Sequence, residues 1–153
     1  MPRHSETRHL PYSPEQLFDL VADVARYDEF LPWVVAVRVH SSSETETVAD
    51  LVVGFSAFKE RFTSRVTKQR PRRIVVDYIE GPLKYLHNEW RFDAAPQGGT
   101  DVHFTVDFAF KSRLFESLAG QMFDRALRRM TGAFEARAAA LYGISSSRAQ
   151  SAA

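Results

Sequence analysis

The stretch from Lys111 to Tyr142 constrains the fold of this chain most, because it combines sustained helical periodicity with a sequence free of proline. Its apolar side chains recur every three or four residues and therefore share one broad face of a helix. They are Phe115, Leu118, Ala119, Met122, Phe123, Ala126, Leu127, Met130, Phe134, Ala138 and Leu141. One face of this predicted C-terminal helix requires burial against another part of the chain.

The opposite side of the predicted helix is polar, with Asp124, Arg125, Arg128 and Glu135. Gly143 follows the helix, and glycine tolerates the left-handed backbone that often ends one, so we expect Gly143 to be the terminating residue. Residues 145–153 are small and polar and have nothing to pack. They predict a disordered tail after a single domain over residues 1–144.

Most of the chain before this helix alternates apolar and polar residues, the pattern of strands with one buried face. Val35 and Val39 are expected on the buried side of one strand, and Asp50 on the exposed side of the next. Strands joined by such short turns are antiparallel neighbours. We therefore predict an α+β fold in which a curved antiparallel sheet of six or seven strands wraps around the C-terminal helix. The alternation occurs around Leu10 and over residues 34–39, 49–55, 58–67, 74–79, 86–92 and 102–110.

Two short helices are expected between the first and second strands. Ser13 can cap a helix that begins at Pro14, and Gln16 can complete a capping box. A second short helical turn, Tyr27 to Leu31, ends at Pro32, which places Trp33 at a bend.

The sequence offers no recognisable catalytic or cofactor-binding motif. It has no cysteine, so thiol chemistry and thiolate metal sites are excluded. The five histidines are scattered without ligand spacing, and glycine-rich phosphate loops are absent. The segment from Gly54 to Phe58 begins like a nucleophile elbow but has Phe58 where glycine is required. We expect no enzyme, no metal and no cofactor.

Charge and hydropathy exclude further classes of function. A formal net charge of +1 argues against a DNA partner, although seven cationic residues crowd the segment from Lys59 to Arg73. This basic segment fits either a solvated sheet surface or a site for phosphates or RNA. Neither a membrane span nor a signal peptide is recognisable, so a soluble, cytoplasmic protein is expected.

Many aromatic and flexible apolar side chains are expected to point inward, where they form either a packed core or the wall of a cavity. Glu60 and Asn88 lie in phase with this set, and an unpaired polar group there would be costly. Each could therefore line a wet cavity or find a partner at a strand end. The inward apolar set is Phe55, Phe62, Tyr78, Trp90, Phe104 and Phe108 from the strands, with Met122 and Met130 from the helix.

Three motifs together carry a resemblance to a known family. They are Tyr27 with Phe30-Leu31-Pro32-Trp33, the run from Phe58 to Val66, and Gly81-Pro82-Leu83 followed by Leu86 and Trp90-Arg91-Phe92. With the terminal helix, their order and spacing over Pro2 to Tyr142 resemble the coenzyme Q-binding protein family. That family belongs to the START-like, polyketide-cyclase-like superfamily with a helix-grip fold, and its bacterial branch includes ribosome-association toxins.

The resemblance implies a hydrophobic cavity that holds ubiquinone or a similar polyprenyl lipid, in a carrier or chaperone supporting respiration. Leu86 on the sheet and Phe30, Leu31 and Trp33 at the cavity mouth join the expected ligand contacts. The segment Tyr27 to Trp33 is expected to form a mobile gate that touches the membrane, at the inner membrane of a bacterial cell. The lack of a transit extension before the first strand fits a bacterial protein better than a mitochondrial one.

Two alternatives remain open within the same resemblance. One is a toxin-like protein that binds a ribosomal subunit through the basic segment. The other is an aromatase or cyclase, for which Glu60 and Tyr78 are the candidate acid and base.

Overall fold

The computed structural model describes residues 3–55 and 58–143, and the side chains of Phe55 and Phe58 lie outside this description, as does the predicted tail over residues 145–153. The elements follow in the order β1 (Arg3–Leu10), α1 (Pro14–Ala22), the 3₁₀ helix η1 (Val24–Glu29), β2 (Val34–Ser42), β3 (Glu46–Phe55), β4 (Phe58–Gln69), β5 (Arg73–Glu80), β6 (Leu83–Ala94), β7 (Thr100–Phe110), α2 (Arg113–Ala138) and the π-helical turn η2 (Ala139–Gly143).

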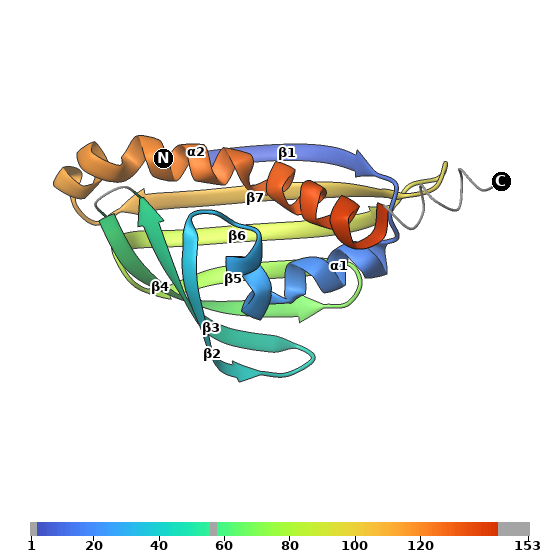
Figure 1. The fold of residues 1–153 in the computed structure, drawn as a ribbon, viewed down its shortest axis with the longest axis horizontal. Coiled ribbons are helices and arrows are strands. Elements are labelled where there is room, and N and C mark those ends of the chain that lie inside the picture. Colours follow the sequence, from blue (N-terminus) through green and yellow to red (C-terminus); the bar gives the residue numbers. More distant parts are fainter. Residues whose placement is uncertain (1–2, 56–57, 144–153) are drawn as a thin grey trace.

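The described strands form one curved, seven-stranded antiparallel sheet in the order β1-β7-β6-β5-β4-β3-β2, which confirms the predicted architecture. Strands β2 to β7 pair consecutively as a meander, and the last strand, β7, also pairs with β1 at the other edge of the sheet. In Figure 1, α2 runs along β1 and β7, and its C-terminal end meets α1. The helices therefore cover one face of the sheet.

The predicted helix start at Ser13 is confirmed in detail. The backbone N–H of Gln16 donates to the Ser13 hydroxyl over 3.1 Å, and the Ser13 N–H donates to the Gln16 side chain over 3.0 Å. The capping box satisfies two N–H groups that the first helical turn cannot pair. It fixes where α1 begins, so that Leu17, Phe18 and Val21 face the core.

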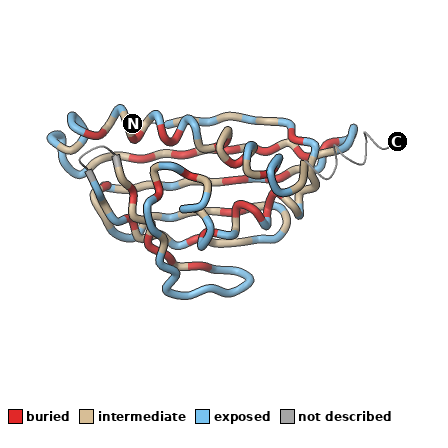
Figure 2. The backbone as a smooth tube through the Cα atoms, viewed as in Figure 1, coloured by how far each residue is buried: buried red, intermediate tan, exposed pale blue. Residues whose placement is uncertain are grey.

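The expected burial of β2 is wrong for Val35 and Val39, although Val34 is buried and Val37 is half-buried against the core. Val35 and Val39 are 50% and 39% exposed, because β2 is an edge strand and the β2–β3 hairpin extends past the helices (Figures 1 and 2). Asp50, expected on an exposed side, is only 5% exposed. Its carboxylate accepts the Thr63 hydroxyl over 2.6 Å and lies 2.8 Å from His40 Nε2. Burial opposes its ionisation, but these hydrogen bonds outweigh burial and lower the pKa of Asp50.

The C-terminal helix departs from prediction at its ends. Leu118 and Leu141 are 54% and 48% exposed, because Leu118 lies on the side of the helix that carries exposed Leu114 and Arg125, and Leu141 falls in the π-helical turn η2. Gly143 has no left-handed backbone and belongs to η2. A Cβ atom there would lie 2.8 Å from the Tyr12 hydroxyl, so close packing, not backbone conformation, favours glycine.

A polar network ties β1 to the middle of α2. The Glu6 carboxylate accepts the hydroxyl of buried Thr131 over 2.6 Å and Arg8 Nε over 2.8 Å. Arg8 Nη1 donates to Glu135 over 2.8 Å. Burial opposes the ionisation of Glu6, but the hydrogen bonds from Thr131, Arg8 and His4 outweigh it and lower the pKa to about 2. The ionised carboxylate therefore stabilises the contact between sheet and helix.

We predict that Glu6→Gln lowers the free energy of unfolding at pH 7 by on the order of 2 kcal/mol. The folded-state pKa lies below the unfolded value of 4.5, so the stabilisation is present above pH 4.5 and is lost as pH falls toward 2. Denaturant unfolding at pH 7 and pH 3 measures the difference. Asp107→Asn, which breaks an exposed 3.5 Å pair with Arg3, is the control and should cost less than about 0.5 kcal/mol. An equal loss for Glu6→Gln at both pH values would contradict this account.

Candidate functional site

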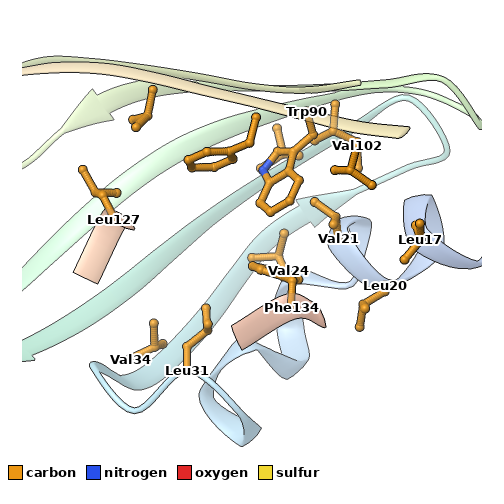
Figure 3. Packing of buried hydrophobic residues seen from close by; sticks show 14 of the residues in the cluster. Leu17, Leu20, Val21, Val24, Leu31, Val34, Trp90, Val102, Leu127 and Phe134 are labelled. Atoms are coloured by element: carbon orange, nitrogen blue, oxygen red, sulfur yellow. The ribbon is translucent and has the colours of Figure 1, made fainter. Parts of the chain in front are cut away.

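An apolar cavity of about 120 Å³ lies between the sheet and α2. Strands β3 to β7 supply one wall, α2 supplies the other, and the segment from Tyr27 to Val34 closes one side. Figure 3 shows Trp90, Leu127 and Phe134 converging on this space with Leu31 and Val34 below them. The lining residues are Tyr27, Leu31, Trp33, Val34, Leu51, Val53, Phe62, Ser64, Val76, Tyr78, Leu86, Asn88, Trp90, Phe104, Val106, Phe123, Ala126, Leu127, Met130 and Phe134.

The size of the cavity limits what it can enclose. A cavity of roughly 150 Å³ binds benzene, whereas drug-sized ligands occupy pockets of roughly 300–1,000 Å³. The 120 Å³ of this structure therefore fits one small ring or a short piece of an aliphatic chain. A longer ligand requires that the cavity widen or that part of the ligand lie outside it.

Two polar side chains at the cavity wall, Asn88 and Tyr78, form hydrogen bonds within the protein. Asn88 donates to the Thr105 carbonyl over 2.8 Å, and its side-chain oxygen accepts the Trp90 indole N–H over 3.0 Å. Asn88 thus satisfies a buried donor that would otherwise be unpaired. The Tyr78 hydroxyl accepts the Leu83 backbone N–H over 2.9 Å, which leaves its own proton available.

Ser64 is the free polar group of the site. It lies beside Tyr78 in the β4–β5 register, and its side chain has no hydrogen-bond partner among the described residues. A serine hydroxyl can donate one hydrogen bond and accept two. Ser64 therefore adds one free hydroxyl to a mostly apolar lining, while the Tyr78 hydroxyl is held at the β5–β6 turn beside Gly81 and Leu83.

The structure brings together nine of the fourteen residues that the sequence suggested as ligand contacts. They are Leu31, Trp33, Phe62, Tyr78, Leu86, Asn88, Trp90, Phe104 and Met130. Phe108 instead packs against Phe110 and Phe123 in the core, with ring centroids 5.7 and 5.0 Å away. Phe30 and Met122 lie in a neighbouring groove, Glu60 lines neither space, and the side chain of Phe55 lies outside the described residues.

Several lining residues were not singled out from the sequence. Val76 and Ser64 alternate in phase with larger inward residues of the same or the neighbouring strand, and only the larger residues were selected as ligand contacts. Ala126 has a small side chain, which gives no sign of a cavity wall. Phe123, Leu127 and Phe134 were predicted to be buried, but periodicity does not distinguish a packed core residue from a cavity wall.

The neighbouring groove is open to solvent and has a volume of about 750 Å³. Trp33 and Ala126 line both the groove and the cavity, so these two side chains stand between them. The other groove residues are Arg8, Phe30, Pro32, Gly54, Met122, Arg125, Arg128, Arg129, Gly132 and Ala133.

The segment proposed as a gate is fastened to α2 at several points. Leu31 is 1% exposed, the Phe30 ring lies 5.0 Å from that of Phe134, and Arg137 bonds Glu29 over 2.6 Å. Arg137 also lies over the Phe30 ring at 5.1 Å. Trp33 is half-buried and is the residue of this segment that faces both spaces.

The arrangement provides little for acid–base catalysis. Burial raises the pKa of Tyr78, and the carboxylates of Glu80 and Glu60 raise it further. Glu60, however, does not line the cavity where a substrate would bind. Within residues 3–55 and 58–143, no group of three metal-ligating side chains comes together.

The chain is similar to several known proteins over most of its length. Residues 10–135 match the family model described as "Polyketide cyclase / dehydrase and lipid transport". The chain is 37% identical over 136 residues to the ribosome association toxin RatA of Rickettsia prowazekii, covering 86% of this chain and 92% of the relative. It is 36% identical over 144 residues to the mitochondrial coenzyme Q-binding protein COQ10 homolog B of Xenopus laevis, covering 92% of this chain but 59% of that relative.

Among solved structures, the 18 kDa protein CC1736 from Caulobacter crescentus is 39% identical, with a TM-score of 0.71. The match covers 94% of this chain and 99% of that one. None of the described helices has a stretch long and apolar enough to cross a bilayer.

We predict that Asn88→Ala lowers the free energy of unfolding by about 1–3 kcal/mol, because it leaves the buried Trp90 N–H without a partner. Ser64→Ala is the matched change in the same cavity and should cost less than about 0.5 kcal/mol, because no hydrogen bond is lost. Denaturant unfolding followed by Trp fluorescence measures both. A loss for Ser64→Ala as large as that for Asn88→Ala would mean that Ser64 also stabilises the fold.

Proposed function

Because the chain belongs to the polyketide cyclase / dehydrase and lipid transport family, we propose that it binds a lipophilic quinone or polyprenyl lipid between its sheet and α2. Ubiquinone is the ligand that this proposal names, and the protein acts as its carrier or chaperone, without catalysing a reaction. The observation that carries the proposal is an apolar cavity lined by two hydroxyl-bearing side chains, Ser64 and Tyr78, of which Ser64 has no hydrogen-bond partner among the described residues.

These hydroxyls suit a quinone. A quinone carbonyl accepts hydrogen bonds but donates none, so it requires donors from the wall. Its ring and methyl groups match the aromatic and aliphatic side chains of Phe62, Val76 and Leu86. At roughly 0.8 kcal/mol for each buried CH₂ group, a few isoprene units would offset the cost of ordering the tail.

Because the cavity is small, the ligand would lie partly in the cavity and partly in the neighbouring groove. One end of the molecule occupies the 120 Å³ cavity, and the remainder passes Trp33 and Ala126 into the 750 Å³ groove. The apolar groove residues Phe30, Pro32 and Met122 would contact the tail.

The direct test is mass spectrometry of lipids extracted from the purified protein, with Val76→Phe as the variant. Val76 lines the cavity, so a phenylalanine there fills the space that the ring requires. Val75→Phe is the matched control, because Val75 immediately precedes Val76 in β5 and points to the other face of the sheet. We expect at least about tenfold less quinone per protein for Val76→Phe than for Val75→Phe, corresponding to ~1.4 kcal/mol. Recovery of no quinone or prenyl lipid from overexpressed wild-type protein would contradict the proposal.

The position of Trp33 predicts how it affects ligand exchange. Trp33→Ala removes part of the wall between cavity and groove, so transfer of quinone from the protein to acceptor liposomes should become faster. Because Trp33 is half-buried, the free energy of unfolding should fall by about 1–2 kcal/mol, less than the ~3–5 kcal/mol typical of a buried aromatic residue. An unchanged transfer rate in a folded variant would exclude Trp33 from the exchange route.

A second candidate function is binding to a ribosomal subunit, which the similarity to RatA favours. Its surface would be the basic segment from Lys59 to Arg73. Ion pairs join Arg65, Arg70 and Arg73 to Glu46, Asp19 and Glu89 and so reduce the positive charge of this segment. Arg61 and Arg72 are exposed and form no ion pair among the described residues. Salt-sensitive cosedimentation with ribosomal subunits that Arg61→Gln/Arg72→Gln abolishes would support this function over the first.

A further inference from the structure

One side of α2 faces solvent with a composition that is unusual for an exposed helix surface. We call it the α2 outer face, made of Leu114, Leu118, Met122, Arg125 and Arg129. Spacings of three and four residues place these side chains along one line of the helix. Leu114 and Leu118 are 69% and 54% exposed, and Arg125 and Arg129 are also exposed. An apolar half is therefore followed by a cationic half.

The two arginines of this face are available to a partner. Neither Arg125 nor Arg129 forms an ion pair within residues 3–55 and 58–143. The neighbouring acidic groups are already engaged, because Asp124 pairs with Arg128 at 2.9 Å and Glu135 pairs with Arg8 at 2.8 Å. The α2 outer face thus carries a positive charge that the described residues do not balance.

The α2 outer face is continuous with the route to the cavity. Met122, Arg125 and Arg129 also line the open groove, and Trp33 and Ala126 separate that groove from the cavity. A partner that covers this face would therefore also cover the mouth through which a ligand must pass.

We propose that the α2 outer face docks onto a lipid bilayer that contains anionic lipids. The exposed leucines would enter the boundary between headgroups and acyl chains, while Arg125 and Arg129 would contact lipid phosphates. A nucleic-acid partner would match the arginines but would leave the two leucines exposed, so the combination favours a membrane. The proposal concerns the surface alone and does not depend on which ligand the cavity holds.

The test is cosedimentation of the full-length protein with vesicles that contain no quinone. One set is phosphatidylcholine alone, and the other is phosphatidylcholine with phosphatidylglycerol. We expect binding to the anionic set only, and weaker binding as salt increases. At about 1 kcal/mol for each arginine near an anionic surface, Arg125→Gln/Arg129→Gln should weaken binding about thirtyfold. Leu114→Ser/Leu118→Ser should also weaken it, by about tenfold or more.

The matched control is Lys84→Gln/Arg91→Gln, which removes the same charge from exposed positions outside the groove and cavity and should bind like the wild type. Circular dichroism establishes that each variant is folded. The proposal is overturned if the control loses as much vesicle binding as Arg125→Gln/Arg129→Gln does, or if both α2 variants bind vesicles like the wild type. It is also overturned if Leu114→Ser/Leu118→Ser changes a dimer into a monomer in light scattering, or if Arg125→Gln/Arg129→Gln affects ribosomal subunits and not vesicles. Because the vesicles lack quinone, failure here leaves the extraction experiment as an independent test of ligand binding.

Discussion

The packing of one helix against a much wider curved sheet determines the rest of this structure. Six strand spacings of about 4.8 Å make the sheet roughly 29 Å across, whereas a helix with its side chains is about 10 Å wide. Helix α2 therefore covers only part of the apolar face. Aromatic contacts fix it there, with the rings of Phe123 and Phe62 stacked 5.7 Å apart and those of Phe134 and Trp90 4.9 Å apart. The surface that α2 leaves uncovered is closed by α1, η1 and the segment up to Trp33, and the cavity remains between the sheet, α2 and the segment from Tyr27 to Val34.

Polar contacts set the position of the helix over that cavity. The Glu6, Arg8 and Thr131 network joins α2 to β1, and the pair between Arg137 and Glu29 joins it to η1. Apolar packing alone is non-directional, so it would allow the helix to slide into the space beneath it. Directional hydrogen bonds on both sides oppose that movement. The exposed side of the same helix carries the leucines and arginines that we assign to the bilayer, so one helix forms both a cavity wall and the docking surface.

The sequence predicted the elements well, because each has a local signal. The capping box at Ser13, the alternation in the strands and the turn at Gly81-Pro82 require only neighbouring residues, and all three are present. Burial was predicted less well, because it depends on what covers an element. Val35 and Leu118 fit their periodic patterns and are nevertheless exposed, because Val35 lies on an edge strand and Leu118 on the solvent side of α2. Asp50 is buried because Thr63 and His40 approach it from other strands, which its own segment does not reveal.

The candidate site was predicted only in part for a related physical reason. Trp90 and Phe104 were expected inside from their strand phase, but the same phase placed Phe108 with them, and Phe108 packs in the core. The difference depends on where along the sheet α2 lies. The central claim, that the space between sheet and α2 is a ligand site, is tested most directly by titrating methyl-labelled protein with a short-chain ubiquinone and recording NMR spectra. The account predicts saturable shifts for the methyl groups of Val76, Leu86 and Met130 with none for Val35 and Val39. Shifts confined to residues outside the cavity, or none at saturating quinone, would contradict it.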